Sequence, residues 1–156
     1  MLEGIKKLHF VGIGGVGMSA IAEVMLDKGY EISGSDLSES AVVKHLKAKG
    51  ATIYKGHDAL NVGGKEALVL SSAIHQDNPE LVAAKAKGLK LFHRSDILAY
   101  LLNDAKGIAV AGAHGKTTTS SMISVVLEHA KVDPTILIGG FVDYLKGIAK
   151  LGKSDY

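Results

Sequence analysis

The feature that most constrains this chain is a pair of glycine-rich loops, each following a short apolar run and preceding a helical pattern. The first loop, Gly12 to Gly17, fits G-x-G-x-x-G and follows the run Ile5 to Val11. The second, Gly112 to Thr119, follows Ile108 to Ala111. A strand that enters a glycine loop and continues into a helix is typical of phosphate binding by backbone amides at a helix N-terminus. We therefore predict two strand-loop-helix units with this chemistry.

Strands and helices are predicted to alternate along the first hundred or so residues. Strands are expected at residues 5–11, 30–33, 52–54, 67–70 and 90–92. Helices are expected from about residue 18 to Gly29, from a cap at Ser38 to Gly50, from a cap at Asn78, and over 95–102. This alternation predicts right-handed crossovers and a parallel sheet with helices on both faces. The predicted fold class is α/β, a Rossmann-like doubly wound parallel sheet.

The remaining residues predict a further strand at Ile108–Ala111, a helix at Thr117–Ala130 and a strand at Thr135–Ile138. A single unit of this size cannot close a parallel sheet or cover both of its faces. We therefore expect a complete domain over residues 1–104, and over 105–156 the truncated start of a second domain. The apolar surface of that start is expected to pack on the first domain or to associate with a second copy.

Composition excludes several classes of function. The chain has no cysteine, a net charge of +2, and only five tyrosines and three phenylalanines as aromatic residues. Thiolate chemistry is therefore excluded, and nucleic acid is a poor candidate partner. No run of apolar residues is long enough to span a membrane, and we expect a cytoplasmic protein. The seven histidines show no metal-ligand spacing.

Polar residues follow the predicted strands where open parallel sheets bind ligands. Asp36 lies about 20 residues beyond the first loop, where an acidic residue can accept hydrogen bonds from a ribose or a base. His57 and the pair Ser71-Ser72 occupy the corresponding ends of two further strands. The residues suit NAD, FAD or another nucleoside diphosphate equally. The alternative is a glycine turn that serves only packing.

The second loop resembles a phosphate-binding P-loop. Lys116 could reach terminal phosphates, and the Thr117 hydroxyl could bind a magnesium ion. Two residues separate Gly112 from Gly115 where the common motif has four. A surface turn is therefore the alternative at this loop.

The motifs together resemble the N-terminal part of the Mur ligases, and among these the type that joins L-alanine to UDP-N-acetylmuramate. The resemblance covers nearly the whole chain, in order: GIGGVGMSAIAEVM, SGSD, GH with Asn61, SSAI, DNPE, AGAHGKTTT, DPT and IGG. It implies an ATP- and magnesium-dependent enzyme of peptidoglycan synthesis with no tightly bound organic cofactor. Its ligands would be UDP-N-acetylmuramate, L-alanine and ATP.

The resemblance also implies roles for individual residues. The UDP-sugar would be bound by Gly14, Gly15, Val16, Gly17, Met18, Ser35, Asp36, His57, Ser71, Ser72, Ala73 and Ile74. ATP would be bound by Gly112, Ala113, His114, Gly115, Lys116, Thr117 and Thr118, with Thr117 on magnesium and both Lys116 and Thr117 catalytic. The substrate carboxylate would attack the γ-phosphate, and the amine of L-alanine would displace phosphate from the acyl phosphate.

Two departures qualify what the resemblance implies. Ala113 replaces the usual threonine of the family, which puts the ATP affinity of the loop in doubt. The chain ends at Tyr156, before the acidic segment of the family, so the chain alone is expected to bind the UDP-sugar without ligating it. The alternatives are a Rossmann module that senses NAD(H) or a nucleotide, and a Mur ligase with another amino-acid or peptide specificity.

Overall fold

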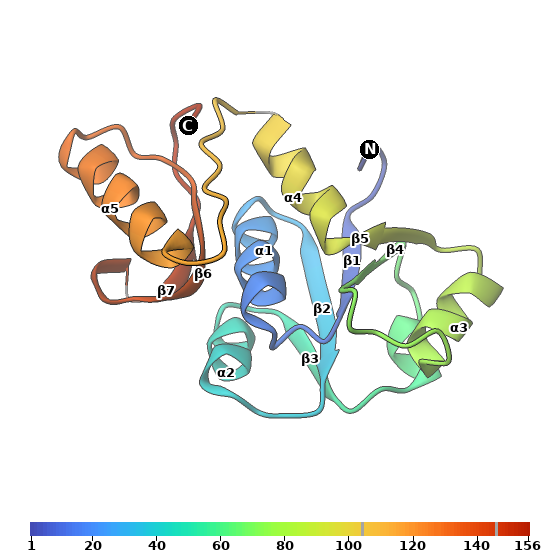
Figure 1. The fold of residues 1–156 in the computed structure, drawn as a ribbon. Helices are drawn as coiled ribbons and strands as arrows, with labels where there is room; N and C mark the ends of the chain where they lie inside the picture. Colours follow the sequence, from blue (N-terminus) through green and yellow to red (C-terminus); the bar gives the residue numbers. More distant parts are fainter. Residues whose placement is uncertain (104, 146) are drawn as a thin grey trace.

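A five-stranded parallel sheet forms the centre of the molecule. The structure is a computed structural model that describes residues 1–103, 105–145 and 147–156. The strands are β1 (Lys7–Val11), β2 (Glu31–Asp36), β3 (Thr52–Lys55), β4 (Ala67–Leu70) and β5 (Lys90–His93). Their order in the sheet is β3-β2-β1-β4-β5, and all neighbouring pairs are parallel. The predicted Rossmann-like sheet is confirmed (Figure 1).

Helices cover both faces of the sheet. On one face lie α1 (Val16–Asp27), α2 (Ala41–Ala48) and α4 (Arg94–Asn103); on the other lie the short η1 (Ala59–Val62) and α3 (Pro79–Ala86). Strand β1 shows why, because its successive side chains point to opposite faces. Leu8 and Phe10 belong to the core beneath α1, whereas Val11 packs with Leu81 of α3. These residues are fully or almost fully buried.

The start of α2 differs from the prediction. The helix is capped by Ser40, whose hydroxyl accepts a hydrogen bond from Val43 N at 3.3 Å, and not by Ser38. Asp36 holds Ser38 in the preceding turn, because its Oδ1 accepts from both the amide and the hydroxyl of that serine. The predicted ends at Gly29 and at the Asn78 cap are confirmed, with Gly29 at φ +88°.

The C-terminal segment, residues 105–156 without residue 146, contains one helix and a hairpin. Its elements are α5 (Lys116–His129), β6 (Ile136–Val142), η2 (Asp143–Leu145) and β7 (Gly147–Lys150). Strands β6 and β7 pair antiparallel, and β7 was not predicted. The strand predicted at Ile108–Ala111 is wrong, because no strand among the described residues pairs with this segment. Side chains of Ile108 and Val110 instead line a groove that separates the segment from β6.

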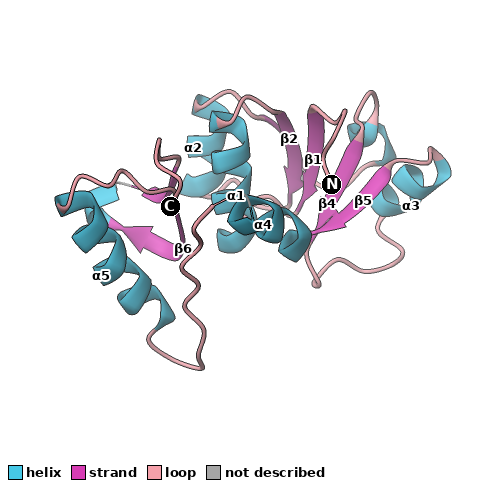
Figure 2. Cartoon of the chain, turned by 90° about the horizontal axis from the view of Figure 1, so that it is seen from above, coloured by secondary structure: helices cyan, strands magenta, loops and turns pink. Residues whose placement is uncertain are grey.

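The hairpin packs against α1. Ile148 and Ala149 of β7 form a buried cluster with Ala20 and Val24 of α1. Figure 2 shows the C-terminal segment beside the sheet domain, on the side that carries α1 and α2. The expectation that this segment packs on the first domain is therefore confirmed for the hairpin, whereas self-association stays a prediction. In the part of the chain that the structure describes, no helix is long and apolar enough to cross a membrane.

Candidate functional site

The first glycine loop is fixed to the end of β2 by backbone hydrogen bonds. Gly12 N and Ile13 N both donate to the carbonyl oxygen of Ser35, at 2.9 and 3.0 Å. Gly14 N donates to Asp36 Oδ2 at 2.8 Å. Asp36 therefore helps to hold the first glycine loop in place. Its carboxylate oxygens retain lone pairs that can accept further hydrogen bonds from a ligand. The loop runs directly into α1, whose N-cap is Gly15.

Gly34 allows this close approach. A Cβ atom at Gly34 would lie 2.7 Å from Cβ and Cδ1 of Ile13 and 2.8 Å from the carbonyl oxygen of Phe10. These separations are shorter than the roughly 3.5–4.0 Å at which carbon atoms pack. A glycine in the middle of β2 therefore lets the loop residue Ile13, which is fully buried, lie directly on the strand.

The Ser71–Ile74 turn closes the loop from the other side. The turn follows β4 and is stabilised by the Ser71 hydroxyl, which accepts from Ala73 N at 3.4 Å. Ile74 Cδ1 lies 3.6 Å from the position of a Cβ atom on Gly12. Strands β1 and β4 are neighbours: the chain adds β2 and β3 on one side of β1, and then crosses from β3 to add β4 and β5 on the other side. Open parallel sheets bind ligands at this switch point, beyond the carboxyl ends of the strands.

Arg94 is a basic residue at this site to which sequence reasoning assigned no role. It begins α4 immediately after β5, and its Nη1 lies 3.0 Å from the position of a Cβ atom on Gly17. The guanidinium group thus lies against the first turn of α1, where backbone amides and the helix dipole favour an anion. The available sequence signal was its place after a strand of the parallel sheet.

Behind the switch point, four polar side chains converge on the carboxylate of Glu80. Oε1 accepts from Asn61 Nδ2 at 2.7 Å and lies 3.2 Å from His9 Nε2. Oε2 accepts from the Ser35 hydroxyl at 2.6 Å and from His57 Nδ1 at 2.9 Å. Glu80 and His9 are completely buried. The carboxylate joins Ser35 of β2 to His57, which follows β3.

The hydrogen bonds keep Glu80 ionised despite its burial. Burial alone would raise the pKa of a carboxyl group, because it removes the charge from water. Hydrogen bonds from His9, Ser35, Asn61 and His57 outweigh that effect and lower the pKa of Glu80 to about 2. A fully paired buried charge of this kind is costly to disturb, since removing one partner leaves the others unsatisfied.

The second glycine loop precedes α5 and folds around its own lysine. The Lys116 ammonium donates to the carbonyl oxygens of Gly112 and Ala113, at 2.5 and 3.2 Å. Gly112 and Gly115 adopt φ values of +150° and +76°, a backbone that favours glycine. Gly115 is the N-cap of α5, so the first amides of this helix open into the loop. Lys116, His114 and Thr118 are all exposed.

Thr117 lies next to the glycine pair of β6. Its Cγ2 is 3.3 Å from the position of a Cβ atom on Gly140. Among the described residues, no group of three or more histidine, aspartate or glutamate side chains could hold a metal ion. The Thr117 hydroxyl is an oxygen ligand of the kind that magnesium accepts.

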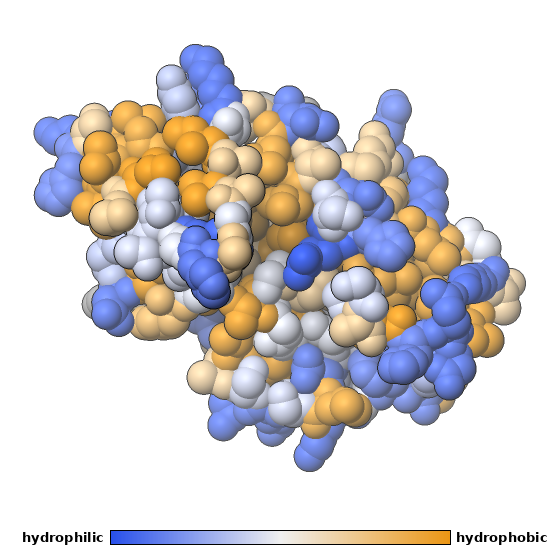
Figure 3. All heavy atoms as spheres, in the orientation of Figure 1, coloured by the Kyte–Doolittle hydropathy of each residue, from blue (hydrophilic) through white to orange (hydrophobic). Residues whose placement is uncertain are grey.

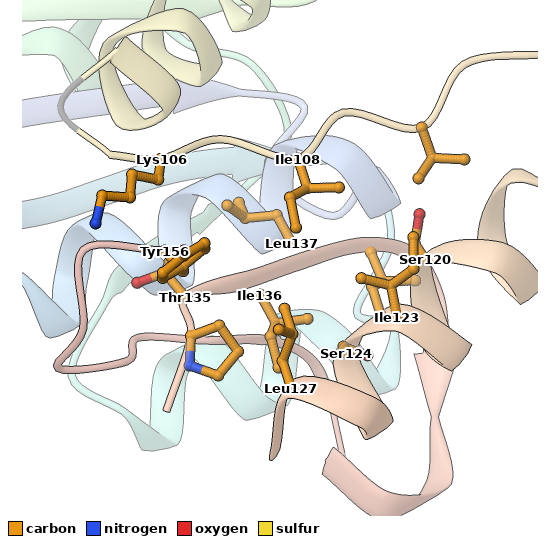
Figure 4. A pocket seen from close by; sticks show the side chains of 13 residues that line it. Lys106, Ile108, Ser120, Ile123, Ser124, Leu127, Thr135, Ile136, Leu137 and Tyr156 are labelled. Carbon is orange, nitrogen blue, oxygen red and sulfur yellow. The ribbon is translucent and has the colours of Figure 1, made fainter. Parts of the chain in front are cut away.

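An apolar groove separates the residues before the second loop from α5 and β6. Figure 4 shows Ile123 and Leu127 of α5 beside Ile136 of β6, with Ile108 across the groove. Figure 3 shows apolar side chains gathered over the α5 region of the surface, where Met122 is 58% exposed and Val126 65% exposed. Among the described residues that line the groove, only Lys106, at one end, has a charged side chain. Most of the described lining is therefore apolar, in contrast to the two glycine loops.

The structure brings most of the predicted first-loop site together. The loop, Ser35, Asp36, His57 and the Ser71–Ile74 turn all lie at the carboxyl ends of β1, β2, β3 and β4. Sequence reasoning missed Glu80 and Arg94. Glu80 was visible in the motif DNPE, although its position in the sequence suggested only a favourable charge at the start of α3.

Comparisons with known proteins agree with this geometry. Residues 7–106 match the model of the Mur ligase family, catalytic domain. UDP-N-acetylmuramate–L-alanine ligase of Hydrogenobaculum sp. (strain Y04AAS1) is 56% identical over 153 residues, which are 98% of this chain and 34% of the relative. The enzyme of the same name from Aquifex aeolicus (strain VF5) is 50% identical over 98% of the chain and 34% of its own length.

Solved structures give the same answer. The UDP-N-acetylmuramate-alanine ligase MurC of Thermotoga maritima superposes with a TM-score of 0.90 at 34% identity, over 96% of this chain and 35% of that chain. The UDP-N-acetylmuramate:L-alanyl-γ-D-glutamyl-meso-diaminopimelate ligase of Neisseria meningitides superposes with a TM-score of 0.87 at 31% identity, over 97% of this chain and 49% of that chain. The chain thus spans about a third of the length of the curated relatives it matches. By sequence and by structure, it belongs to the Mur ligase family.

Proposed function

We propose that this chain is the UDP-N-acetylmuramate-binding part, with the start of the ATP-binding part, of a ligase that adds L-alanine to that substrate. The observation that carries the proposal is the first glycine loop, held by Ser35 and Asp36 at the switch point of the sheet. The boundary between the two parts is placed at residues 104 and 105. The substrate is inferred from the relatives, which are named for UDP-N-acetylmuramate.

The diphosphate of the UDP-sugar fits the start of α1. The amides of residues 14–18 lie at a helix N-terminus, and the Arg94 guanidinium lies beside Gly17. Backbone amides and arginine are the two groups that proteins use most readily for phosphates. In this proposal Asp36 and His57 would contact the ribose and the base, and the Ser71–Ile74 turn would contact the sugar.

The second loop fits the phosphates of ATP. Lys116 is positioned by carbonyl oxygens of its own loop and can turn from them to terminal phosphate oxygens. Bound ATP would supply the phosphoryl group that activates the substrate carboxylate, and the amine of L-alanine would then displace phosphate. Lys116 would offset the negative charge that develops during this transfer, which is catalysis by position and electrostatics.

Calorimetric titration tests the proposal directly. We expect UDP-N-acetylmuramate and UDP to bind the chain and NAD not to bind. Saturating ligand at about 100 times its dissociation constant should also stabilise the fold by about 2.7 kcal/mol, which a thermal melt detects. Lys116→Ala serves as the matched control, because it lies in the other loop and should leave the affinity for UDP unchanged. Binding of NAD without UDP would support a dinucleotide-sensing module instead.

A second specificity is tested separately, because the Neisseria ligase superposes almost as well as the alanine ligase. Both proteins are named for UDP-N-acetylmuramate as a substrate. Activity assays of the longer protein with ATP, UDP-N-acetylmuramate and either L-alanine or a muropeptide would separate the two. We expect turnover with L-alanine, and turnover with the peptide alone would refute that assignment.

A further inference from the structure

The carboxylate of Glu80 determines which nitrogen of His57 can carry a proton. His57 Nδ1 lies 2.9 Å from Glu80 Oε2 and 3.0 Å from the Ser35 hydroxyl oxygen. The Ser35 hydroxyl donates its proton to the same carboxylate oxygen at 2.6 Å. An ionised carboxylate only accepts hydrogen bonds, so Nδ1 must be the protonated nitrogen of His57. In the neutral ring the other nitrogen, Nε2, is then an acceptor.

Nothing in the described part of the chain uses that acceptor. No hydrogen-bond partner of Nε2 is found among the described residues, and the His57 side chain is 19% exposed. The ring follows β3 and is linked through Ser35 to the first glycine loop, because the Ser35 carbonyl holds Gly12 N and Ile13 N. His57 therefore presents an acceptor at the edge of the sheet where the loop binds phosphate.

We propose that Glu80 is a positioning residue that fixes His57 as an acceptor for an N–H or O–H donor of the bound uridine nucleotide. The proposal deepens the proposed function and rests on it. The uracil imide N–H and the two ribose hydroxyls are the donors of this class that UDP offers. Glu80 itself touches no ligand, since it is completely buried and acts through the histidine ring.

The same domain offers a matched control. Glu23 of α1 is 5% exposed, and its Oε1 lies 2.9 Å from His45 Nε2, so it forms a second pair of carboxylate and histidine. Lys49 also donates to Glu23, and the pair packs between α1 and α2, away from the carboxyl ends of the strands. Glu23→Gln therefore makes the same chemical change as Glu80→Gln in a pair that has no connection to the loop.

The spectroscopic test reads the tautomer without any ligand. Imidazole ¹⁵N chemical shifts of the histidine-labelled chain should show His57 as the Nδ1–H form. In Glu80→Gln the two carboxylate oxygens, which accept from four donors, would be replaced by one amide oxygen and one NH2 group. The tautomer of His57 should then no longer be fixed. An Nε2–H form of His57 in the unmodified chain would overturn the proposal, whatever the chain binds.

The binding test uses UDP and a double-mutant cycle. His57→Ala and Glu80→Gln should each weaken UDP binding about tenfold. This is the loss expected when one hydrogen bond to the ligand is removed and water only partly compensates for it. If Glu80 acts through His57, the double variant should bind UDP no more weakly than His57→Ala alone. Additive losses would overturn the positioning role. Glu23→Gln should bind UDP within twofold of the unmodified chain.

Parallel titrations with CDP identify the donor. Cytosine has an acceptor where uracil has its imide N–H, so a base donor predicts weak CDP binding that His57→Ala does not weaken further. A ribose donor predicts equal losses for UDP and CDP. If UDP binds the unmodified chain and His57→Ala equally well, this inference fails and the proposed function stands. If UDP does not bind the folded chain at all, both fail.

Discussion

Replacing Gly34 by alanine should destabilise the sheet and displace the first glycine loop. The added Cβ would lie 2.7 Å from two atoms of Ile13 and 2.8 Å from the carbonyl oxygen of Phe10. Ile13 is fully buried, and Phe10 belongs to the central strand β1, so neither can give way cheaply. Overpacking of this kind costs about 1–3 kcal/mol of stability. Because the added Cβ also meets backbone, we expect Gly34→Ala to cost about 3 kcal/mol.

Thermal melts measure this effect. About 1 kcal/mol shifts the Tm of a domain of this size by about 2–4 °C, so we expect Tm to fall by about 6–12 °C. UDP binding should also weaken at temperatures where the variant is folded, because Ile13 is part of the loop. The control is Gly139→Ala in β6, where an added Cβ meets no atom within 4 Å. A Tm of Gly34→Ala within about 2 °C of the unmodified chain would refute the packing argument.

Three further predictions concern charge, packing and the anion site. The pKa of Glu80 is lowered from 4.5 to about 2, so its contribution of about 3 kcal/mol should be complete above pH 4.5 and lost as pH falls toward 2. Urea midpoints of the unmodified chain and Glu80→Gln should converge over that range, and a constant difference would contradict the linkage. Ile148→Ala should cost about 2–4 kcal/mol locally and speed amide exchange in β6 and β7 while β1 stays protected; uniform acceleration would argue against the hairpin as a separate unit. Arg94→Ala should weaken UDP binding about tenfold but leave uridine binding unchanged, with Lys90→Ala as the control, and equal losses for UDP and uridine would exclude a phosphate contact.

The sheet domain could be predicted from the sequence because each local signal agreed with the global fold. Apolar runs, glycine ends and the Asn78 cap all pointed to alternating strands and helices. The cap of α2 was misassigned because two serines precede the helix. Asp36 accepts from the amide and the hydroxyl of Ser38, two residues further on, and this local turn holds Ser38 outside the helix, so Ser40 is the cap.

The C-terminal segment was harder to predict. The run Ile108–Ala111 has the composition of a buried strand, but a strand requires a neighbour with which to share hydrogen bonds. Among the described residues β6 pairs with β7 instead. Strand β7 is short, and it forms because it pairs with β6 and packs on α1. Neither condition can be read from a short window of sequence.

The candidate site was only partly visible for a similar reason. Glycine loops have a fixed local spacing, so Gly12 to Gly17 and Gly112 to Gly115 could be found directly. The Glu80 network joins residues up to 71 positions apart in the chain, as the pair His9 and Glu80 shows. Only the order of the strands brings His9, Ser35 and His57 to one carboxylate.

Binding of the UDP-sugar diphosphate by the first glycine loop can be tested at individual residues. Amide chemical shifts of the ¹⁵N-labelled chain, recorded while UDP-N-acetylmuramate is added, locate the ligand residue by residue. We expect the largest changes at the amides of residues 12–18, at the Ser71–Ile74 turn and at His57, with residues 112–118 unchanged. Saturable changes confined to residues outside these segments, or no changes at millimolar ligand in a folded sample, would contradict the claim.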